Sequence, residues 1–415
     1  MGASEEKPYR VYRGGRDKGK VPLARRDREA RRARRTDGPG GSGPGGGGLP
    51  PAGPGKITRK GDRPGRRRLW FGWTWKRWTF VTIFLLFLLV VVWGVLGYLA
   101  VDSGVSAANA RLPQSVRPAL TPDTGSLYDS STNILLVGTD HATGAARAAE
   151  QHSDSLTLLH TDPGRGRLVY VSIPRDLYVD IPGVGYSKIN AAMQTGGPKL
   201  AIKTIDKLLG KDLRVNHVVF VDFNEFVTLI DAVGGITVNV PEEIKSNKFD
   251  CPYPAKRCAT WPGWIFHKGP THMDGRHALI FSRIRENTLD PSWTDFARQH
   301  DQQLVEQATL QKLASPSQFF SLPFNGDSLL APIATDLSTW QLTQLAWVKF
   351  RSSTGSDLHC RLGGTAQTVN GQDVIVGDVP RETQVLRAVL GLNAPPSIND
   401  LYEAGCTVGT SGSFK

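Results

Sequence analysis

An uncharged apolar run, WTFVTIFLLFLLVVVWGVLGYLA, occupies residues 78–100 and restricts the architecture of this chain more than any other feature. As a helix the run spans roughly 34 Å, which is enough to cross the hydrocarbon core of a bilayer. Trp78 begins it, and Trp93 and Tyr98 lie near its end, as is typical of interfacial aromatic residues. A cleavable signal peptide is the alternative, but its apolar region is about 7–15 residues long and lies near the start of a chain. We therefore expect a retained single-pass membrane helix.

The net charge of +12 comes from the segment before this run. Residues 1–77 contain 22 Lys+Arg and 7 Asp+Glu, whereas the remaining residues contain 28 Lys+Arg and 31 Asp+Glu. The positive-inside rule then predicts a cytoplasmic tail and an extracellular part over residues 101–415, anchored in the cell membrane. The Gly/Pro-rich composition of the tail predicts disorder. The tail could attract anionic membrane lipid or an acidic partner, or could serve as an orientation signal alone. Nucleic acid is not an expected partner, because no binding fold accompanies the charge.

All four cysteines follow the apolar run, on the side where disulfides persist. Four cysteines allow three pairings, and the sequence does not choose among them. Cys251 and Cys258 are close enough for a local loop disulfide. No CxxC pair is present, so a zinc site is not expected.

The extracellular part divides into a proline-containing linker (101–130), a globular domain (131–395) and a C-terminal extension (396–415). The domain contains short β-branched runs that predict strands, two of which are joined by the turn sequence TDPGRGR and should therefore be antiparallel. Helical segments alternate with the later strands. We expect an α/β fold, an α–β–α sandwich with a mixed central sheet. The predicted strands are NILLVG, SLTLLH, RLVYVSI, HVVFVDF and ITVNV, and the predicted helices include PKLAIKTIDKLLG and DFNEFVTLIDAVGG.

Two aspartates stand at the ends of neighbouring predicted strands. Asp140 closes LLVGTD, and Asp154 opens HSDSLTLL. Each alone is typical of a turn or helix cap. Together they could supply hard oxygen ligands to one Mg²⁺ (or Mn²⁺), which usually takes one or two carboxylates plus phosphate oxygens.

Charged residues also gather after the third predicted strand, in SIPRDLYVDIPGVGYSKIN. Arg175 and Asp176 leave the strand, and Lys188 and Asn190 follow across a Pro/Gly-rich return loop. A solubilising loop does not require its charges to converge, whereas an anion site does. We expect the loop to bring these four residues together at one place near the end of the strand.

Two further groups of charged residues lie downstream. In FSRIRE, Arg283 and Arg285 share one face if the segment is extended and diverge if it ends a helix. Paired guanidiniums suit a phosphate between them. In DFARQHDQQ, the i, i+3 and i+4 spacings stack three side chains on one helical face, as either a site or an exposed helix. These three side chains are Asp295, Arg298 and Gln302.

Other enzyme classes have little support in the sequence. Histidines are present, but no serine lies in a GxSxG elbow. There is no HExxH metalloprotease motif, and the glycines at 196 and 197 lack the lysine arrangement of a P-loop.

The ordered motifs together resemble the LytR-CpsA-Psr family, from about Asn133 to roughly Leu310. Any one motif is weak evidence, but eight in order behind one membrane span are specific. They are NILLVGTD, SDSLTLLH, VSIPRDLYVDIPG, KINAA, TGGP, VDFNEFVTLIDAVGGITVNVPEEI, MDGRHALIFSRIR and DFARQHDQQ.

The resemblance implies a membrane-anchored phosphotransferase that moves a glycopolymer from an undecaprenyl-pyrophosphate carrier to a peptidoglycan hydroxyl. The polyprenyl tail would enter an apolar pocket. By position, Asp140 and Asp154 match magnesium ligands, and Asp154 could also act as the general base. The matching pyrophosphate-binding residues are Arg175, Arg283 and Arg285, with Asp176, Lys188, Asn190, Asp295, Arg298 and Gln302 around them.

Two positions depart from the family pattern, because His152 and Asp301 stand where arginines are usual. Loss of two cations, one replaced by an anion, should weaken the grip on a pyrophosphate. The alternative is therefore a non-catalytic polyprenyl-phosphate binder that regulates or scaffolds wall assembly. A third hypothesis, supported by the long tail alone, is a signalling protein that senses wall intermediates.

Overall fold

The computed structural model describes residues 75–140, 152–247, 251, 253–293, 295–400 and 402–409. The expected cytoplasmic tail up to residue 74 lies outside the described residues. The side chains of Asp140, His152, Ser153, Asp154 and Asp295 also lie outside them, although the backbone of each is described. The described α-helices are α2 (Trp75–Arg111), α3 (Asn190–Leu209), α4 (Phe223–Ala232), α5 (Ala255–Cys258), α6 (Gly275–Phe281), α7 (Asp295–Leu313), α8 (Pro316–Leu330), α9 (Thr339–Arg351) and α10 (Val379–Val389).

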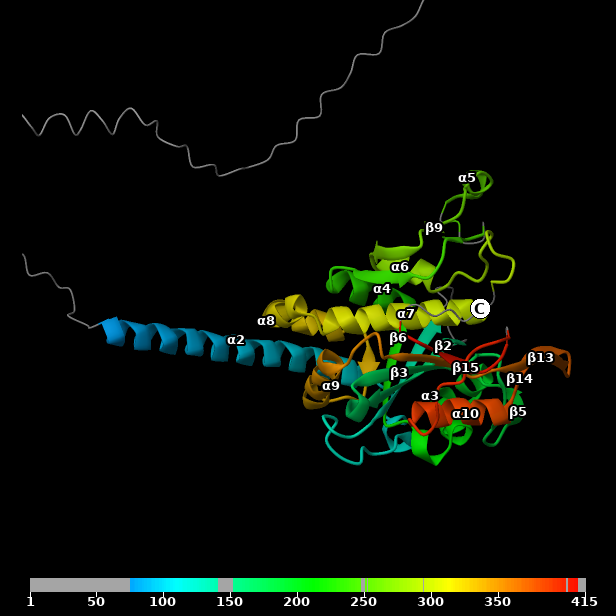
Figure 1. Ribbon diagram of the computed structural model, residues 1–415, viewed down its shortest axis with the longest axis horizontal. Coiled ribbons are helices and arrows are strands. Elements are labelled where there is room, and N and C mark those ends of the chain that lie inside the picture. Colours follow the sequence, from blue (N-terminus) through cyan, green and yellow to red (C-terminus); the bar gives the residue numbers. More distant parts are fainter. Residues whose placement is uncertain are drawn as a thin grey trace, which may run out of the picture. The chain divides into compact units, whose positions relative to one another are not determined.

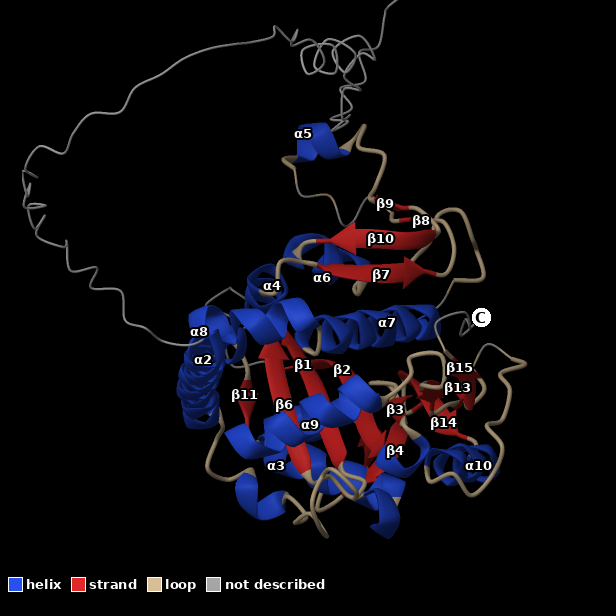
Figure 2. Cartoon of the chain, turned by 60° about the vertical axis from the view of Figure 1, so that its left-hand side comes forward, coloured by secondary structure: helices blue, strands red, loops and turns tan. Residues whose placement is uncertain are grey.

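A mixed sheet forms the centre of the domain (Figure 2). Among the described residues it has seven strands in the order β11-β6-β1-β2-β3-β12-β15. β1 is antiparallel to β2 and parallel to β6, and β2 is antiparallel to β3, as the turn sequence between them predicted. The bounds are β1 Asn133–Asp140, β2 His152–Asp162, β3 Arg167–Ser172, β6 His217–Asp222, β11 Ala334–Thr335, β12 Leu358–Arg361 and β15 Gly405–Val408.

Alternate residues of each strand meet different helices, because successive side chains point to opposite faces. Leu135 of β1 belongs to a core with Ile202 of α3 and Val385 of α10. The preceding residue, Ile134, packs instead with Val348 of α9. Helices therefore cover both faces, and the expected α–β–α sandwich with a mixed sheet is confirmed.

A smaller layer packs on the far side of α7, which runs between it and the main sheet (Figure 2). It contains α4, α6 and the predicted strand ITVNV, which is β7 and pairs with β10 rather than with the main sheet. The remaining described strands form antiparallel pairs of their own. They are β4 Tyr178–Ile181 with β5 Gly185–Lys188, β7 Ile236–Val240 with β10 Gly269–Met273, β8 Ile244–Lys245 with β9 Ile265–Phe266, and β13 Gly364–Val369 with β14 Gln372–Gly377.

The predicted helix signals act where they were expected. Asp222 and Glu225 form a reciprocal capping box that begins α4, with Glu225 N donating to Asp222 Oδ1 over 2.7 Å. α3 ends at Leu209 before Gly210, but it begins earlier than expected, at Asn190, and bends at Gly196 and Gly197. Pro198 then starts the straight second part, where its missing N–H is tolerated.

The apolar run lies in α2, which among the described residues is the helix long and apolar enough to cross a membrane. α2 continues past the run to Arg111, so it enters the domain without a break (Figure 1). Beyond it, Leu112 and Val116 are buried in the main core, and Leu127 is also buried. Residues 101–130 therefore differ from the expected free linker, since their apolar side chains complete the domain.

The two disulfides join Cys251 to Cys258 and Cys360 to Cys406. The first is the local loop disulfide that the spacing suggested. The second links neighbouring strands β12 and β15, so the end of the chain belongs to the main sheet. The expected C-terminal extension thus contributes an edge strand.

Candidate functional site

A cavity of about 1350 Å³ lies between the sheet face covered by α7 and α9 and the helix α8. Its wall is mostly apolar. Leu136 and Leu159 come from the strands, Leu310 from α7, and Phe319 and Trp347 from α8 and α9. A cavity of this size and lining suits a long hydrocarbon ligand.

One face of α7 carries polar side chains into this cavity. Arg298, Gln302 and Glu306 follow one another at four-residue spacing and all line it. Arg298 is 2% exposed, so its guanidinium forms part of the wall and is not a surface charge. Gln302 Nε2 donates to the carbonyl of Ser282 over 3.1 Å, which ties α7 to the segment after α6. The alternative of an exposed helix is therefore wrong.

Arg283 follows α6 in a turn, with its backbone N donating to the carbonyl of Ile280, and Arg285 lies in irregular backbone after that turn. Ile284 between them is fully buried, while both arginines are exposed and line the cavity. Both arginines therefore reach the cavity wall, although the segment is neither the extended stretch nor the helix end between which the sequence left the choice open. The guanidinium of Arg283 lies 4.3 Å from the centre of the Phe223 ring, so the first residue of α4 supports it.

The strand ends that carry the remaining predicted residues meet at one edge of the sheet. Asp140 pairs with His152, and Asp154 is the extra residue of a bulge between Thr139 and Gly138 of β1. The two aspartates thus occupy neighbouring backbone positions, although their side chains lie outside the described part. This placement fits a divalent cation that takes few protein ligands.

The return loop after β3 closes on itself as expected. Asn190 N donates to the carbonyl of Arg175 over 3.2 Å, so the two ends of the loop are adjacent. Asp176 lies between two cations, with Oδ1 2.8 Å from Lys188 Nζ and Oδ2 3.5 Å from Arg175 Nε. Ile173 N donates to the carbonyl of Leu156, so the loop leaves the sheet beside the start of β2.

The sequence-predicted residues therefore divide into two neighbouring groups. Among the described side chains, the cavity wall includes Arg283, Arg285, Arg298 and Gln302. It does not include those of the return loop, Arg175, Asp176, Lys188 and Asn190. Asp295 begins α7, but its side chain lies outside the described part.

Asp301, one of the two departures from the family pattern, is a buried residue. It is 1% exposed and, among the described residues, is absent from the cavity wall. Burial, together with the nearby charge of Glu242, raises the pKa of Asp301 well above its ordinary value. Asp301 therefore lies buried away from the described cavity wall, and its expected weakening of the phosphate grip stays a prediction.

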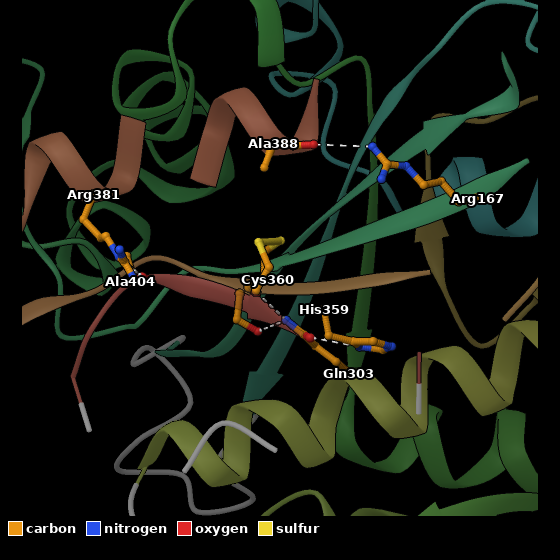
Figure 3. Close-up of a disulfide and its surroundings, with 9 residues drawn as sticks. Arg167, Gln303, His359, Cys360, Arg381, Ala388 and Ala404 are labelled. Atoms are coloured by element: carbon orange, nitrogen blue, oxygen red, sulfur yellow. Dashed lines mark hydrogen bonds between the residues drawn. A yellow bond between two sulfur atoms is a disulfide. The ribbon is translucent and has the colours of Figure 1, made fainter. Parts of the chain in front are cut away.

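Gln303, two residues after Asp301, points toward Cys360 and His359 of β12 (Figure 3) and, among the described residues, is absent from the cavity wall. Its Nε2 donates to Ser172 Oγ and to the carbonyl of Cys360, at 2.6 and 2.9 Å. Its Oε1 lies 3.1 Å from Nδ1 of His359, whose pKa burial lowers to about 3, so a neutral imidazole donates there. Gln302 and Gln303 thus have separate tasks, one at the site and one in the core.

Glu306 is the site residue that sequence reasoning missed. Burial raises its pKa to about 8, so the side chain is a neutral acid at ordinary pH. Its position four residues after Gln302 was the available signal, because this spacing continues the same helical face.

Comparisons with known proteins agree with this geometry. The chain is 29% identical to the polyisoprenyl-teichoic acid–peptidoglycan teichoic acid transferase TagU of Oceanobacillus iheyensis, over 71% of this chain and 88% of that protein. It is 34% identical to the TagU of Bacillus mycoides, over 57% of this chain and 74% of that protein. The solved structure of TagT bound to LIIa-WTA matches with a TM-score of 0.51 and 26% identity, over 68% of this chain and 99% of that one.

A family model described as the LytR_cpsA_psr family matches residues 100–388, which is more than half of the chain. The matched region includes the central sheet except its edge strand β15, together with α7 and every predicted site residue. The chain belongs to the LytR_cpsA_psr family.

Proposed function

We propose that this protein transfers a glycopolymer from a polyprenyl-pyrophosphate carrier to a hydroxyl of peptidoglycan. The observation that carries the proposal is the cavity, whose apolar wall includes Arg283, Arg285 and Arg298. A hydrocarbon chain fits such a wall, and guanidiniums suit the phosphates at its head. The relatives named as teichoic acid transferases support the same reaction.

In the proposed reaction, the acceptor hydroxyl oxygen attacks the phosphorus that bears the polymer. A new P–O bond forms, the bond to the bridging oxygen breaks, and polyprenyl phosphate leaves. Arginines stabilise the charge on the phosphate oxygens. The proton of the hydroxyl passes to a carboxylate, for which Asp154 at the sheet edge is our candidate.

Asp140 and Asp154 are the residues that would hold Mg²⁺ or Mn²⁺. Their adjacent backbone positions support this assignment. A bound divalent cation would neutralise negative charge on the pyrophosphate. We assign the return loop, with Arg175, Asp176, Lys188 and Asn190, to positioning of the acceptor or the pyrophosphate at the same edge.

We also propose that α2 crosses the cell membrane once, with the basic tail in the cytoplasm and the domain outside. The positive charge before the apolar run and the two disulfides after it both support this orientation.

The test uses the purified full-length chain in detergent micelles, with a polyprenyl-pyrophosphate-linked sugar, peptidoglycan fragments and Mg²⁺. We expect sugar to become attached to peptidoglycan and Arg283→Ala or Asp154→Ala to abolish this transfer. A matched control is Arg387→Ala, which removes an exposed arginine of α10 away from the cavity wall.

Tight binding of the donor without transfer or pyrophosphate cleavage, under Mg²⁺ or Mn²⁺, would overturn the transferase proposal. It would instead support the regulator or scaffold. Deletion of residues 1–68 tests the signalling alternative, which requires the tail, whereas the transferase should keep its activity in vitro.

A further inference from the structure

Helix α8 exposes an aromatic surface that the reaction does not require. Phe319, Phe320 and Phe324 are all exposed, and Phe324 is 85% exposed. Scattered exposed apolar residues are normal, but adjacent large ones on a single helix indicate an interaction surface. The neighbouring helix α2 indicates what covers this aromatic surface.

α8 lies against α2, the helix that contains the apolar run (Figures 1 and 2). The rings of Trp93 and Phe319 are 4.7 Å apart, and Trp93 Nε1 donates to the carbonyl of Phe320 over 3.3 Å. Within the run, a Cβ at Gly97 would lie 3.5 Å from the Cβ of Leu322, and beyond the run a Cβ at Gly104 would lie only 2.8 Å from the carbonyl oxygen of Asp327. Such glycine-mediated contact is typical of helices that associate within membranes.

These contacts also fix the depth of α8 relative to α2. Contacts progress in the same direction on both helices, from Trp93 with Phe319 to Gly104 with Asp327. Trp93 precedes the end of the apolar run at Ala100 by about 10 Å of helix rise. The N-terminal part of α8 therefore lies beside the apolar run, not beyond it.

The two helices change from apolar to polar at the same level. On α2 the first charge after the run is Asp102. On α8, residues 316–324 are uncharged and include the three exposed phenylalanines, and the first charge is Asp327, opposite Gly104. Two segments distant in the sequence thus share one polarity boundary, as expected if both meet the same membrane surface.

We propose that residues 316–324 of α8 are immersed in the acyl chains of the membrane leaflet next to the domain. The backbone of this segment tolerates the environment of the acyl chains. Helical hydrogen bonds satisfy most of its polar groups, and the Ser315 side chain accepts from Gln318 N at the start of the helix. The occupant of the aromatic surface is therefore lipid hydrocarbon and not a second protein.

This placement has a consequence for the carrier, which rests on the proposed function. Phe319 and Phe320 line the cavity as well as the aromatic surface. The cavity is therefore bounded by a helix at the level of the acyl chains. A polyprenyl chain can pass sideways from the leaflet into the cavity while its pyrophosphate stays at the polar boundary.

The first experiment measures immersion without any reference to activity. All four native cysteines are in disulfides, so an introduced cysteine can be labelled selectively. Full-length Phe324→Cys, carrying an environment-sensitive fluorophore, is reconstituted into phosphatidylcholine vesicles with nitroxides on the acyl chains. We expect loss of most of its emission. Val379→Cys, on α10 and 69% exposed, is the matched control and should keep its emission.

Equal emission from the two labels would overturn the proposal. A Phe324 label that responds to protein density in the vesicle but not to the nitroxide lipid would assign the surface to a second copy instead. Neither outcome depends on the transferase reaction, so a failure of immersion is distinguishable from a failure of the proposed function.

The second experiment tests the sideways entry. Phe324 is absent from the cavity wall, so Phe324→Glu should leave transfer from a detergent-soluble short-chain donor unchanged. Transfer from a full-length polyprenyl donor embedded in vesicles should fall. Equal loss with both donors would indicate damage to the fold, and no loss with either would refute entry along α8.

Discussion

The two faces of the central sheet are made from the same strands but differ in packing. On the face under α3 and α10, residues such as Leu135 and Val171 belong to a continuous core. On the face under α7 and α9, neighbours such as Leu136 line a cavity of about 1350 Å³. Residue type in the strands does not explain this difference, because both faces are rich in Leu, Ile and Val.

The covering helices explain it. α3 presents Ala201, Ile202 and Ile205 to the face without the cavity (the closed face; the face that lines the cavity is the open face). These side chains fill the space between helix and sheet. α7 presents Arg298 and Glu306 to the face that lines the cavity, where polar side chains interrupt the apolar packing between helix and sheet. One face therefore stabilises the fold, and the other retains space for a ligand.

The largest effect should come from Arg298, the cation inside the wall of the open face. We expect Arg298→Ala to lower transfer by about 10²–10³-fold, the scale seen when one group that stabilises developing charge is removed. Initial rates of polymer attachment measure it, and thermal melting shows that the variant is folded. Arg387→Ala on α10 should change neither quantity, and an equal fall in both variants would break the distinction between the two faces.

Adjacent residues of β1 offer the next test. Leu135→Trp adds volume to the filled core and should destabilise the protein by about 1–3 kcal/mol. Leu136→Trp adds the same volume to the cavity, so its stability should stay within about 0.5 kcal/mol of the parent. Denaturant unfolding measures both. The Leu136 variant should bind the polyprenyl donor more weakly, and equal destabilisation of the two would show that the open face is also filled.

The raised pKa of Glu306, a residue of the open face, predicts that the stability of the protein depends on pH. Burial raises its pKa from 4.5 to about 8, so the folded state binds more protons than the unfolded state between these values. The stability from the neutral acid is thus full below about pH 4.5 and is lost as pH rises toward about 8.

Glu306→Gln keeps the shape and cannot ionise, so it should melt like the parent near the lower pH and at a higher temperature near the upper one, by roughly 2–4 °C for each kcal/mol that the parent loses. Melting curves across this range measure the difference. Gln307→Glu is no substitute as a control, because Gln307 bonds the buried Asp357. Thr383→Val on α10 is suitable, and it should shift melting equally at every pH.

Local patterns predicted much of this structure. Strand alternation, the turn between β2 and β3 and the Asp222–Glu225 capping box depend on residues near one another in the chain, and each was found as expected. The helical face of Arg298 and Gln302 is local in the same sense. Arg283 and Arg285, two residues apart, both reach the cavity wall, although Arg283 lies in a turn and not in the extended segment that the spacing argument assumed.

The features that sequence did not predict depend on distant partners. The pKa of Asp301 is raised by its burial and by the nearby Glu242, about sixty residues away in the chain. β7 does not join the main sheet, because it pairs with β10. The segment after α2 is ordered by contacts with the main core, which its proline content alone did not reveal.

The smallest effect should come from the ring that supports Arg283 at the open face. Phe223→Leu removes a cation–π contact, and its loss should raise the KM for the donor about two- to fivefold at unchanged kcat. Phe226→Leu is the matched control, because Phe226 lies on the same helix and also lines the cavity.

Steady-state kinetics on both variants separate two causes. A selective effect of Phe223 means that the ring orients a phosphate-binding cation, whereas equal effects mean that α4 contributes only apolar wall. In the second case Arg283 would be positioned by Gln302 and the Ser282 carbonyl, and Gln302→Leu should then raise the KM instead.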